Sequence, residues 1–213
     1  MQTTTDRPTA GRLRTAWRAA NAPVAGVPRW AAVTAHLVPL LVLPSGIWRI
    51  VTVTFNVGGG AGKGSGEVPA WLPIELYVVL LSVLSELLAF SAVGLVARWG
   101  EVFPRWTPGL AGRRVPPALV IIVASAGAAI LTVVWTVGAV AVGRGTTVQG
   151  DPLPADFPLR TDTWDGLLAI GAYAPLYAWG PALAVLTVHY ARRRLNRAHR
   201  AAPRRARPDL PRA

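Results

Sequence analysis

Four long apolar stretches constrain this chain more than any other feature of its sequence. They cover about residues 30–55, 72–97, 117–142 and 164–190. A helix needs about 20 predominantly apolar residues to cross the hydrocarbon core of a bilayer, and each stretch exceeds that length. Inside lipid, a helix also satisfies its own backbone polar groups. The sequence therefore predicts an all-α, polytopic membrane protein built as a four-helix, up-down-up-down transmembrane bundle.

Composition supports this class. Of 213 residues, 52% are hydrophobic, and the mean hydropathy of +0.39 is too high for an ordinary soluble domain. The absence of cysteine excludes disulfides, iron–sulfur clusters and thiol chemistry. A net charge of +12, taken for the whole chain, would suggest nucleic-acid binding. The distribution argues against it, because the basic residues collect beside the apolar stretches. Lys63 is the single lysine among 22 basic residues, which is typical of a high-GC bacterial genome.

The distribution of basic residues predicts the orientation. The amino tail (1–29), the segment 98–115 and the carboxyl tail (192–213) hold 5, 4 and 9 of them, whereas loops 56–71 and 143–163 hold 1 and 2. Short loops rich in Lys and Arg stay in the cytoplasm. We therefore expect a multi-pass protein of the bacterial plasma (inner) membrane with both termini cytoplasmic. The expected domains are a mostly disordered basic tail (1–29), a transmembrane domain (30–191) and an Arg-rich disordered tail (192–213).

Arginine and tryptophan side chains near the expected inner face predict contact with anionic lipid headgroups. The residues with this expected role are Arg98, Trp99, Arg105, Trp106, Arg113, Arg114, Arg192, Arg193 and Arg194. The expected partner is thus a bilayer with anionic headgroups on its cytoplasmic side. A homo-oligomer or a membrane-protein partner stays open, and nucleic acid is the less favoured partner of the basic tail.

Ionisable residues inside a span are costly and mark functional sites by default. Glu86 falls near the middle of the second stretch, and Arg49 and Glu75 fall toward the outer ends of theirs. Glu75, Ser82 and Glu86 follow i, i+7, i+11 spacing and share one helical stripe. We therefore expect a polar cluster in the outer half of the bundle, in which Arg49 pairs with Glu86 or Glu75. Its expected hydrogen-bonding partners are Tyr173, Tyr177, Ser82 or Thr132.

Two interpretations of this cluster stay open. In the favoured one, a buried ion pair fixes the helix register, with Arg49 reaching partly outward along its long stem. In the other, Glu86 is a proton-titrating or ligand-binding carboxylate.

Several apparent motifs lack the residue order or spacing that their function requires. The glycine-rich segment 58–66 lacks the order of a phosphate-binding loop, since Lys63 is followed by Gly64, and it favours a flexible linker. The aspartates of loop 143–163 lack the spacing of a calcium-binding loop. His36 and His189 stand without a haem-attachment motif and are expected at different depths. The sequence predicts no cofactor and no metal site.

Two stretches resemble a known group of proteins: Pro44-Ser45-Gly46-Ile47-Trp48-Arg49 in the first span, and residues 98–106 followed by 112–116 in the inner loop. They are similar to multi-span membrane proteins of high-GC Gram-positive bacteria that have no assigned activity. The resemblance covers about a quarter of the chain directly. It implies membrane location and no chemistry, and it marks Arg49 and the inner loop.

The leading functional hypothesis is a non-enzymatic integral membrane protein, an accessory or structural subunit with a buried Arg–Glu cluster. The alternative is a small oligomeric transporter or ion-coupled permease that uses Glu86. An enzyme acting on lipid is the weakest hypothesis, because the spans offer no His–carboxylate or paired-acid arrangement.

Overall fold

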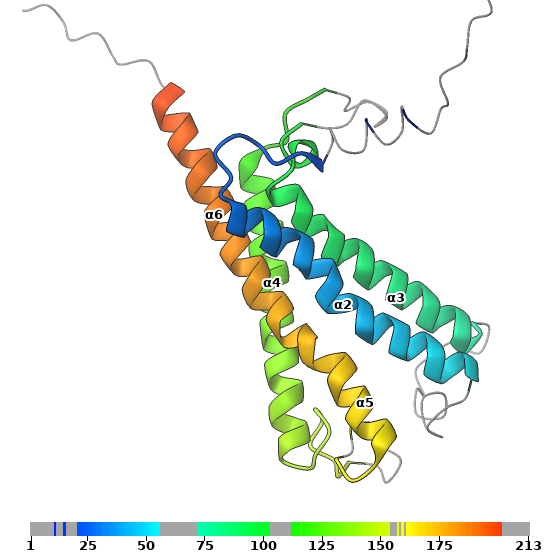
Figure 1. Ribbon diagram of the computed structural model, residues 1–213. Helices are drawn as coiled ribbons and strands as arrows, with labels where there is room; N and C mark the ends of the chain where they lie inside the picture. Colours follow the sequence, from blue (N-terminus) through cyan, green and yellow to red (C-terminus); the bar gives the residue numbers. More distant parts are fainter. Residues whose placement is uncertain are drawn as a thin grey trace, which may run out of the picture.

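The computed structural model describes residues 11, 15, 21–55, 72–102, 112–153, 157, 159 and 161–201, with side chains up to residue 197. Within these ranges the chain is all-helical, as expected, and β pairing is limited to isolated bridges. Figure 1 shows the long helices packed together toward the upper end, from which they diverge in pairs toward the lower end. Four helical segments are long and apolar enough to cross a membrane: Arg29–Phe55, Ile74–Leu95, Pro117–Gly143 and Trp164–Arg197.

The first two apolar stretches form a helical pair. Helix α2 (Arg29–Phe55) continues through Pro39 and Pro44, and α3 (Ile74–Ser91) leads into two 3₁₀ turns, η1 (Ala92–Leu95) and η2 (Arg98–Gly100). The two helices pack where their side chains are small. A Cβ built on Gly46 would lie 3.7 Å from the Cβ of Ser82, in ordinary van der Waals contact. Small residues of this kind let two helices approach closely.

The last two apolar stretches form a second pair. Helix α4 (Pro117–Gly143) begins with proline at its first position, where a missing N–H costs nothing. Helix α5 (Trp164–Tyr173) begins at Thr163, whose hydroxyl accepts a hydrogen bond from the Gly166 N–H at 3.2 Å. A 3₁₀ turn, η3 (Ala174–Ala178), follows and carries Pro175 near its start. Helix α6 (Trp179–Ala201) completes the fourth stretch.

Helix α6 runs further than the sequence indicated. We expected disorder from residue 192, but the helix continues to Ala201. This expectation was wrong for residues 192–201, because arginines in this part of the helix bind other segments of the protein. The described core lies between α2 and α6, where Ala31, Ala35 and Val38 pack with Leu186 and Tyr190. Helix α3 packs on α2, and α4 packs on α6.

Helix α4 shows how close the packing becomes. A Cβ on Gly180 of α6 would lie 2.8 Å from the backbone nitrogen of Thr132, so only glycine fits there without a shift. The opposite face of α4 is apolar and exposed, with Ile122 and Ile130 more than half accessible. An exposed apolar face of this extent suits a lipid environment.

Four chain segments meet at one end of the molecule, the upper end in Figure 1. The Val24 N–H donates to the Val96 carbonyl at 2.9 Å, which joins the segment before α2 to the segment after α3. The Val115 N–H donates to the Glu101 carbonyl at 3.0 Å, which joins the segment after α3 to the start of α4. The charged half of α6 lies against both junctions. This end carries the candidate site.

Candidate functional site

Glu101 is positioned by a tight turn after α3. A Cβ on Gly100 would collide with the carbonyl oxygen of Gly94, and a Cβ on Gly94 would lie 2.7 Å from the Trp99 ring. Both positions therefore require glycine, because backbone packs directly on backbone and on the indole. The Trp99 Nε1–H donates to Asn21 Oδ1 at 3.3 Å. The turn is thus held from the amino-terminal segment as well as from α3.

Three arginines of α6 surround the Glu101 carboxylate. Arg193 Nη2 lies 3.1 Å from Oε1, Arg197 Nη1 lies 3.5 Å from Oε1, and Arg194 Nη1 lies 3.6 Å from Oε2. The exposed fraction of the side chain is 14% for Glu101 and rises from 6% for Arg193 through 17% for Arg194 to 42% for Arg197. The ion pair of Glu101 with Arg193 is therefore buried, whereas the pair with Arg197 is partly screened by solvent.

The same arginines also bind backbone carbonyls of three separate segments. Arg193 Nη2 donates to the Leu95 carbonyl at 3.1 Å, at the end of η1. Arg194 Nη2 donates to the Val115 carbonyl at 3.2 Å, just before α4. Arg197 donates to the Ala25 carbonyl, in the segment before α2. A guanidinium has five donors and can bridge a carboxylate and a carbonyl at once.

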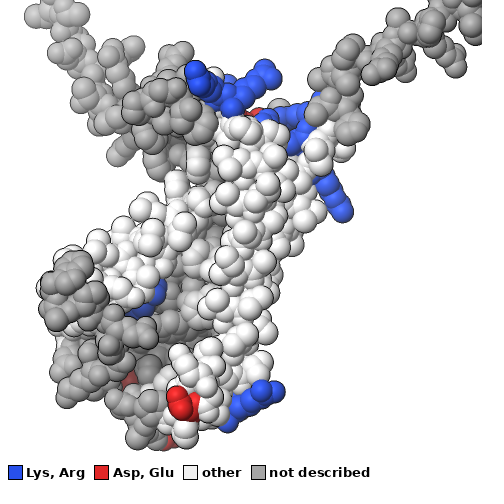
Figure 2. Space-filling model, turned by 180° about the vertical axis from the view of Figure 1, so that it is seen from behind, with Lys and Arg blue, Asp and Glu red and all other residues white. Residues whose placement is uncertain are grey.

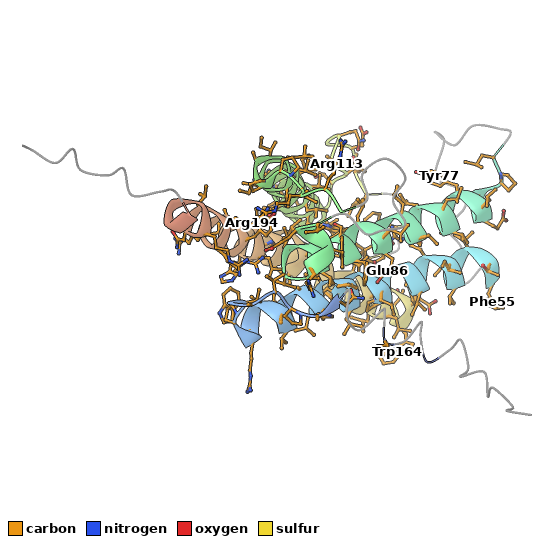
Figure 3. The ribbon with its side chains drawn as sticks, turned by 90° about the horizontal axis from the view of Figure 1, so that it is seen from above. Phe55, Tyr77, Glu86, Arg113, Trp164 and Arg194 are labelled. Carbon is orange, nitrogen blue, oxygen red and sulfur yellow. The ribbon has the colours of Figure 1, made fainter. Side chains whose placement is uncertain are left out.

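Tyr190 completes the group. It is fully buried, and the guanidinium carbons of Arg193 and Arg194 lie 5.7 and 5.9 Å from its ring centroid, within range of a cation–π interaction. We call Glu101, Tyr190, Arg193, Arg194 and Arg197 the Glu101 cluster. Figure 3 looks onto this end and labels Arg194. The cluster ties α6 to the segments before α2, after α3 and before α4.

The expected buried Arg–Glu pair therefore exists, but with other residues. Among the described side chains, Arg49 has no ion pair with Glu75 or Glu86, and its Nε donates to the Ser45 carbonyl of its own helix at 3.2 Å. The pairing we expected was wrong because of an axial offset. Gly46 faces Ser82, so Arg49 and Glu86 lie on opposite sides of that level. The offset is about 10 Å at 1.5 Å per residue.

Among the described side chains, none of the hydrogen-bonding partners expected for Arg49 has a hydrogen bond with it. The rings of Tyr173 and Tyr177 pack against Trp135 of α4, with centroids 6.3 and 5.8 Å apart. The Thr132 hydroxyl donates to the Ala128 carbonyl of its own helix at 2.7 Å. Ser82 is buried, and its Oγ has no hydrogen-bond partner within the described parts of the chain. The two tyrosines line a cavity of about 690 Å³ between the end of α4, α5 and the loop that joins them.

The arginines and tryptophans expected at the headgroups divide into three groups. Four are exposed: Arg98, Arg113, Arg114 and Arg192. Arg105 and Trp106 lie outside the described residues. Arg193 is buried against Glu101, so our expectation that it contacts lipid headgroups was wrong. Arg194 is largely covered, and the Trp99 ring stacks on Phe90 with centroids 6.1 Å apart.

The histidines show no common site. His36 is exposed and its Nδ1 lies 2.7 Å from the Ala32 carbonyl, while His189 meets the Trp30 ring edge-on at 5.3 Å. Over the ranges that the structure describes, no group of three or more His, Cys, Asp or Glu side chains could hold a metal ion. Figure 2 shows instead that Lys and Arg side chains gather at the end that holds the Glu101 cluster.

Comparison with protein-family models, with curated proteins and with solved structures finds no match for this chain. The site must therefore be interpreted from its own geometry. The sequence contained one signal for it that we did not use. Glu101 is the single acidic residue in the basic segment 98–115, and Arg193 and Arg197 are spaced one helical turn apart. A lone carboxylate in a basic loop is a natural partner for such a pair.

Proposed function

We propose that this chain is a multi-pass integral membrane protein of accessory or structural type, without enzymatic activity of its own. The observation that carries the proposal is the buried Glu101–Arg193 pair, which joins the inner loop to the last helix. Charged groups in a buried cluster can specify one arrangement of helices. Among the described residues, the buried charged side chains join segments of the protein itself. This arrangement suits a scaffold or subunit role.

The proposal includes an orientation. The end with the Glu101 cluster faces the cytoplasm of a bacterial cell, both tails are inside, and consecutive spans cross in alternating directions. Arg98, Arg113, Arg114 and Arg192 then lie at the inner leaflet, where each exposed arginine contributes about 1 kcal/mol of attraction to anionic lipid.

Single-cysteine labelling tests the orientation, because the natural chain has no cysteine. We expect Ser65→Cys and Ala155→Cys variants to react with a membrane-impermeant maleimide in intact cells. Ala10→Cys and Ala202→Cys variants should react only after permeabilisation. Labelling of positions 65 and 155 only after permeabilisation would overturn the proposed orientation.

The accessory role is tested by purification after cross-linking in native membranes. A defined partner or a second copy should be recovered in fixed ratio with the wild-type chain. The same partner should be lost from the Glu101→Gln variant, which disturbs the cluster, and retained by the control variant Glu75→Gln. Substrate uptake by the purified chain alone in sealed vesicles would instead contradict an accessory role.

A second candidate is a small oligomeric transporter or ion-coupled permease. One observation favours it. Glu86 is half-buried within α3, and it has no ion pair or hydrogen bond with any other described residue. A carboxylate at membrane depth without a structural partner remains free to bind a proton or cation.

A further inference from the structure

A cavity of about 690 Å³ lies between the end of α4, α5 with η3, and the loop that joins α4 to α5. It is at the lower end of the molecule in Figure 1, opposite the Glu101 cluster. Its described lining is mainly apolar and includes Val142, Leu159 and Ile170. Ligand cavities in proteins commonly have volumes of about 300–1,000 Å³ and apolar walls with a few polar groups. This cavity therefore has the size and the lining of a small-molecule site.

The walls of the cavity are held by contacts within the described chain. The Leu153 N–H of the loop donates to the Gly145 carbonyl at 3.0 Å, which brings Leu153 back against the end of α4. The rings of Tyr173 and Tyr177 pack on Trp135, with centroids 6.3 and 5.8 Å from that of the indole. Backbone pairing and ring packing thus build two of the walls.

One carboxylate supplies charge to the cavity. Asp162 is the only charged residue among the described residues that line it. Asp162 and the neighbouring Thr161 are exposed, so the polar end of the cavity reaches solvent. The hydroxyl group of Thr163 caps α5 and so fixes the chain next to Asp162. Arg144, which follows the last residue of α4, lines a separate cavity. The cavity therefore combines an anionic rim with an apolar interior.

We propose that this cavity binds a cationic amphiphile, whose protonated amine lies against the Asp162 carboxylate and whose apolar body occupies the interior beside Tyr173 and Tyr177. Charge complementarity selects the head, because an ammonium N–H donates a charge-assisted hydrogen bond to a carboxylate. An exposed carboxylate exchanges one cationic partner for another at little cost, since water and salt screen such pairs. The apolar lining selects the body, because binding removes its surface from water. The site lies apart from the Glu101 cluster, and the proposal does not rest on the accessory role.

Four probes separate the head of the ligand from its body: octylamine, octanol, octanoate and ethylamine. The experiment measures saturable binding of radiolabelled octylamine to the full chain in a nonionic detergent at neutral pH, where the amine is protonated. The other probes then compete with it. We expect octanol to require about three- to tenfold higher concentrations than unlabelled octylamine. Octanoate should compete less well than octanol, and ethylamine should not compete over the same range.

Three results of this experiment would overturn the proposal. Binding of octylamine that rises linearly without saturation would show that only the detergent takes it up. Equal competition by octanol or octanoate would show that charge does not select the ligand. Competition by ethylamine at the concentrations of octylamine would show that the apolar interior is not used.

The variant Asp162→Asn tests the head, since it keeps the shape of the side chain and removes its charge. The affinity for octylamine should fall about three- to tenfold, to that of octanol, while the affinity for octanol stays unchanged. The matched control is Asp165→Asn, which removes an equal charge from an exposed residue of α5 that does not line the cavity. Equal losses in the two variants would show that the general charge of this end attracts the amine, which would contradict contact with Asp162.

The variant Gly143→Leu tests the interior. Gly143 lines the cavity, and a Cβ built on it meets nothing within 4 Å. The added side chain should occupy part of the interior and weaken binding of octylamine and octanol alike by about tenfold. Gly138→Leu is the matched control on the same helix, because a Cβ there also meets nothing within 4 Å and Gly138 does not line the cavity. Wild-type affinity in Gly143→Leu would show that the amphiphile binds elsewhere.

Discussion

The Glu101 carboxylate and the Arg193 guanidinium form a buried ion pair between the loop after α3 and the last helix, with Oε1 and Nη2 3.1 Å apart. The side chains are 14% and 6% exposed, so water screens the pair little. Glu101 Oε1 makes no aligned hydrogen bond within the described residues, so opposite charge accounts for the attraction. This pair fixes the axial position of α6 relative to the ends of its neighbours.

Glu101→Gln should destabilise the protein strongly. The substitution preserves the shape of the side chain but leaves Arg193 buried without its counter-charge, and breaking a buried pair in this way costs about 3–5 kcal/mol. Thermal unfolding in nanodiscs measures the loss as a lowered melting temperature. Glu75→Gln on α3 is the control, because Glu75 is exposed. An unchanged melting temperature for Glu101→Gln would contradict a structural role of the pair.

The double variant separates the pair from the rest of the cluster. With Arg193→Gln added, no buried charge is left uncompensated at the centre, so the double variant should be less destabilised than the sum of the two single variants. A coupling free energy of about 0.5–3 kcal/mol is expected for residues in direct contact. Strict additivity would indicate that Glu101 and Arg193 act independently.

Arg197→Gln should have a much smaller effect than Arg193→Gln. Both residues reach the same carboxylate oxygen, but the Arg197 side chain is 42% exposed. Solvent-exposed ion pairs contribute about 0–1 kcal/mol, and salt screens them further. Melting curves of the two variants at low and high salt provide the measurement. A loss for Arg197→Gln as large as that for Arg193→Gln would show that burial does not decide the strength of these contacts.

Gly180→Ala should loosen the contact between α4 and α6. The added Cβ would lie 2.8 Å from the backbone nitrogen of Thr132, so one helix must move. Overpacking of this kind typically costs about 1–3 kcal/mol. Gly171→Ala is the matched control within α5, because a Cβ there meets nothing within 4 Å. Equal melting temperatures for the two variants would show that the helices can separate at this point without loss.

The fold class was predictable from the sequence because hydropathy alone defines where long helices form. The four stretches were assigned to within a few residues of the observed helices, apart from the extension of α6. That extension was missed because residues 192–201 are rich in arginine and resemble a solvated tail. The helix continues because Glu101 and the carbonyls of Leu95 and Val115 bind those arginines.

The residues of the site were less predictable, because pairing across helices depends on rotation and axial offset. Arg49 and Glu86 fall in neighbouring spans, yet the contact of Gly46 with Ser82 sets them about 10 Å apart along the axis. Glu101 could be recognised as a lone acid, but its position depends on the fit of Gly100 against the Gly94 carbonyl. Such close contacts between backbone groups are visible only in three dimensions.

Glu86→Gln should behave in the opposite way to Glu101→Gln. Glu86 has no ion pair to lose among the described residues, and neutralising an acid at membrane depth removes part of its insertion cost. We therefore expect the abundance and the melting temperature of the variant to equal or exceed those of the wild type. Expression level and thermal unfolding, measured beside Glu101→Gln, check this expectation. A loss of stability would instead assign Glu86 a structural partner in the bundle. If stability is kept while a pH-linked uptake by reconstituted wild-type vesicles disappears in the variant, the carboxylate serves transport and the permease becomes the better functional assignment.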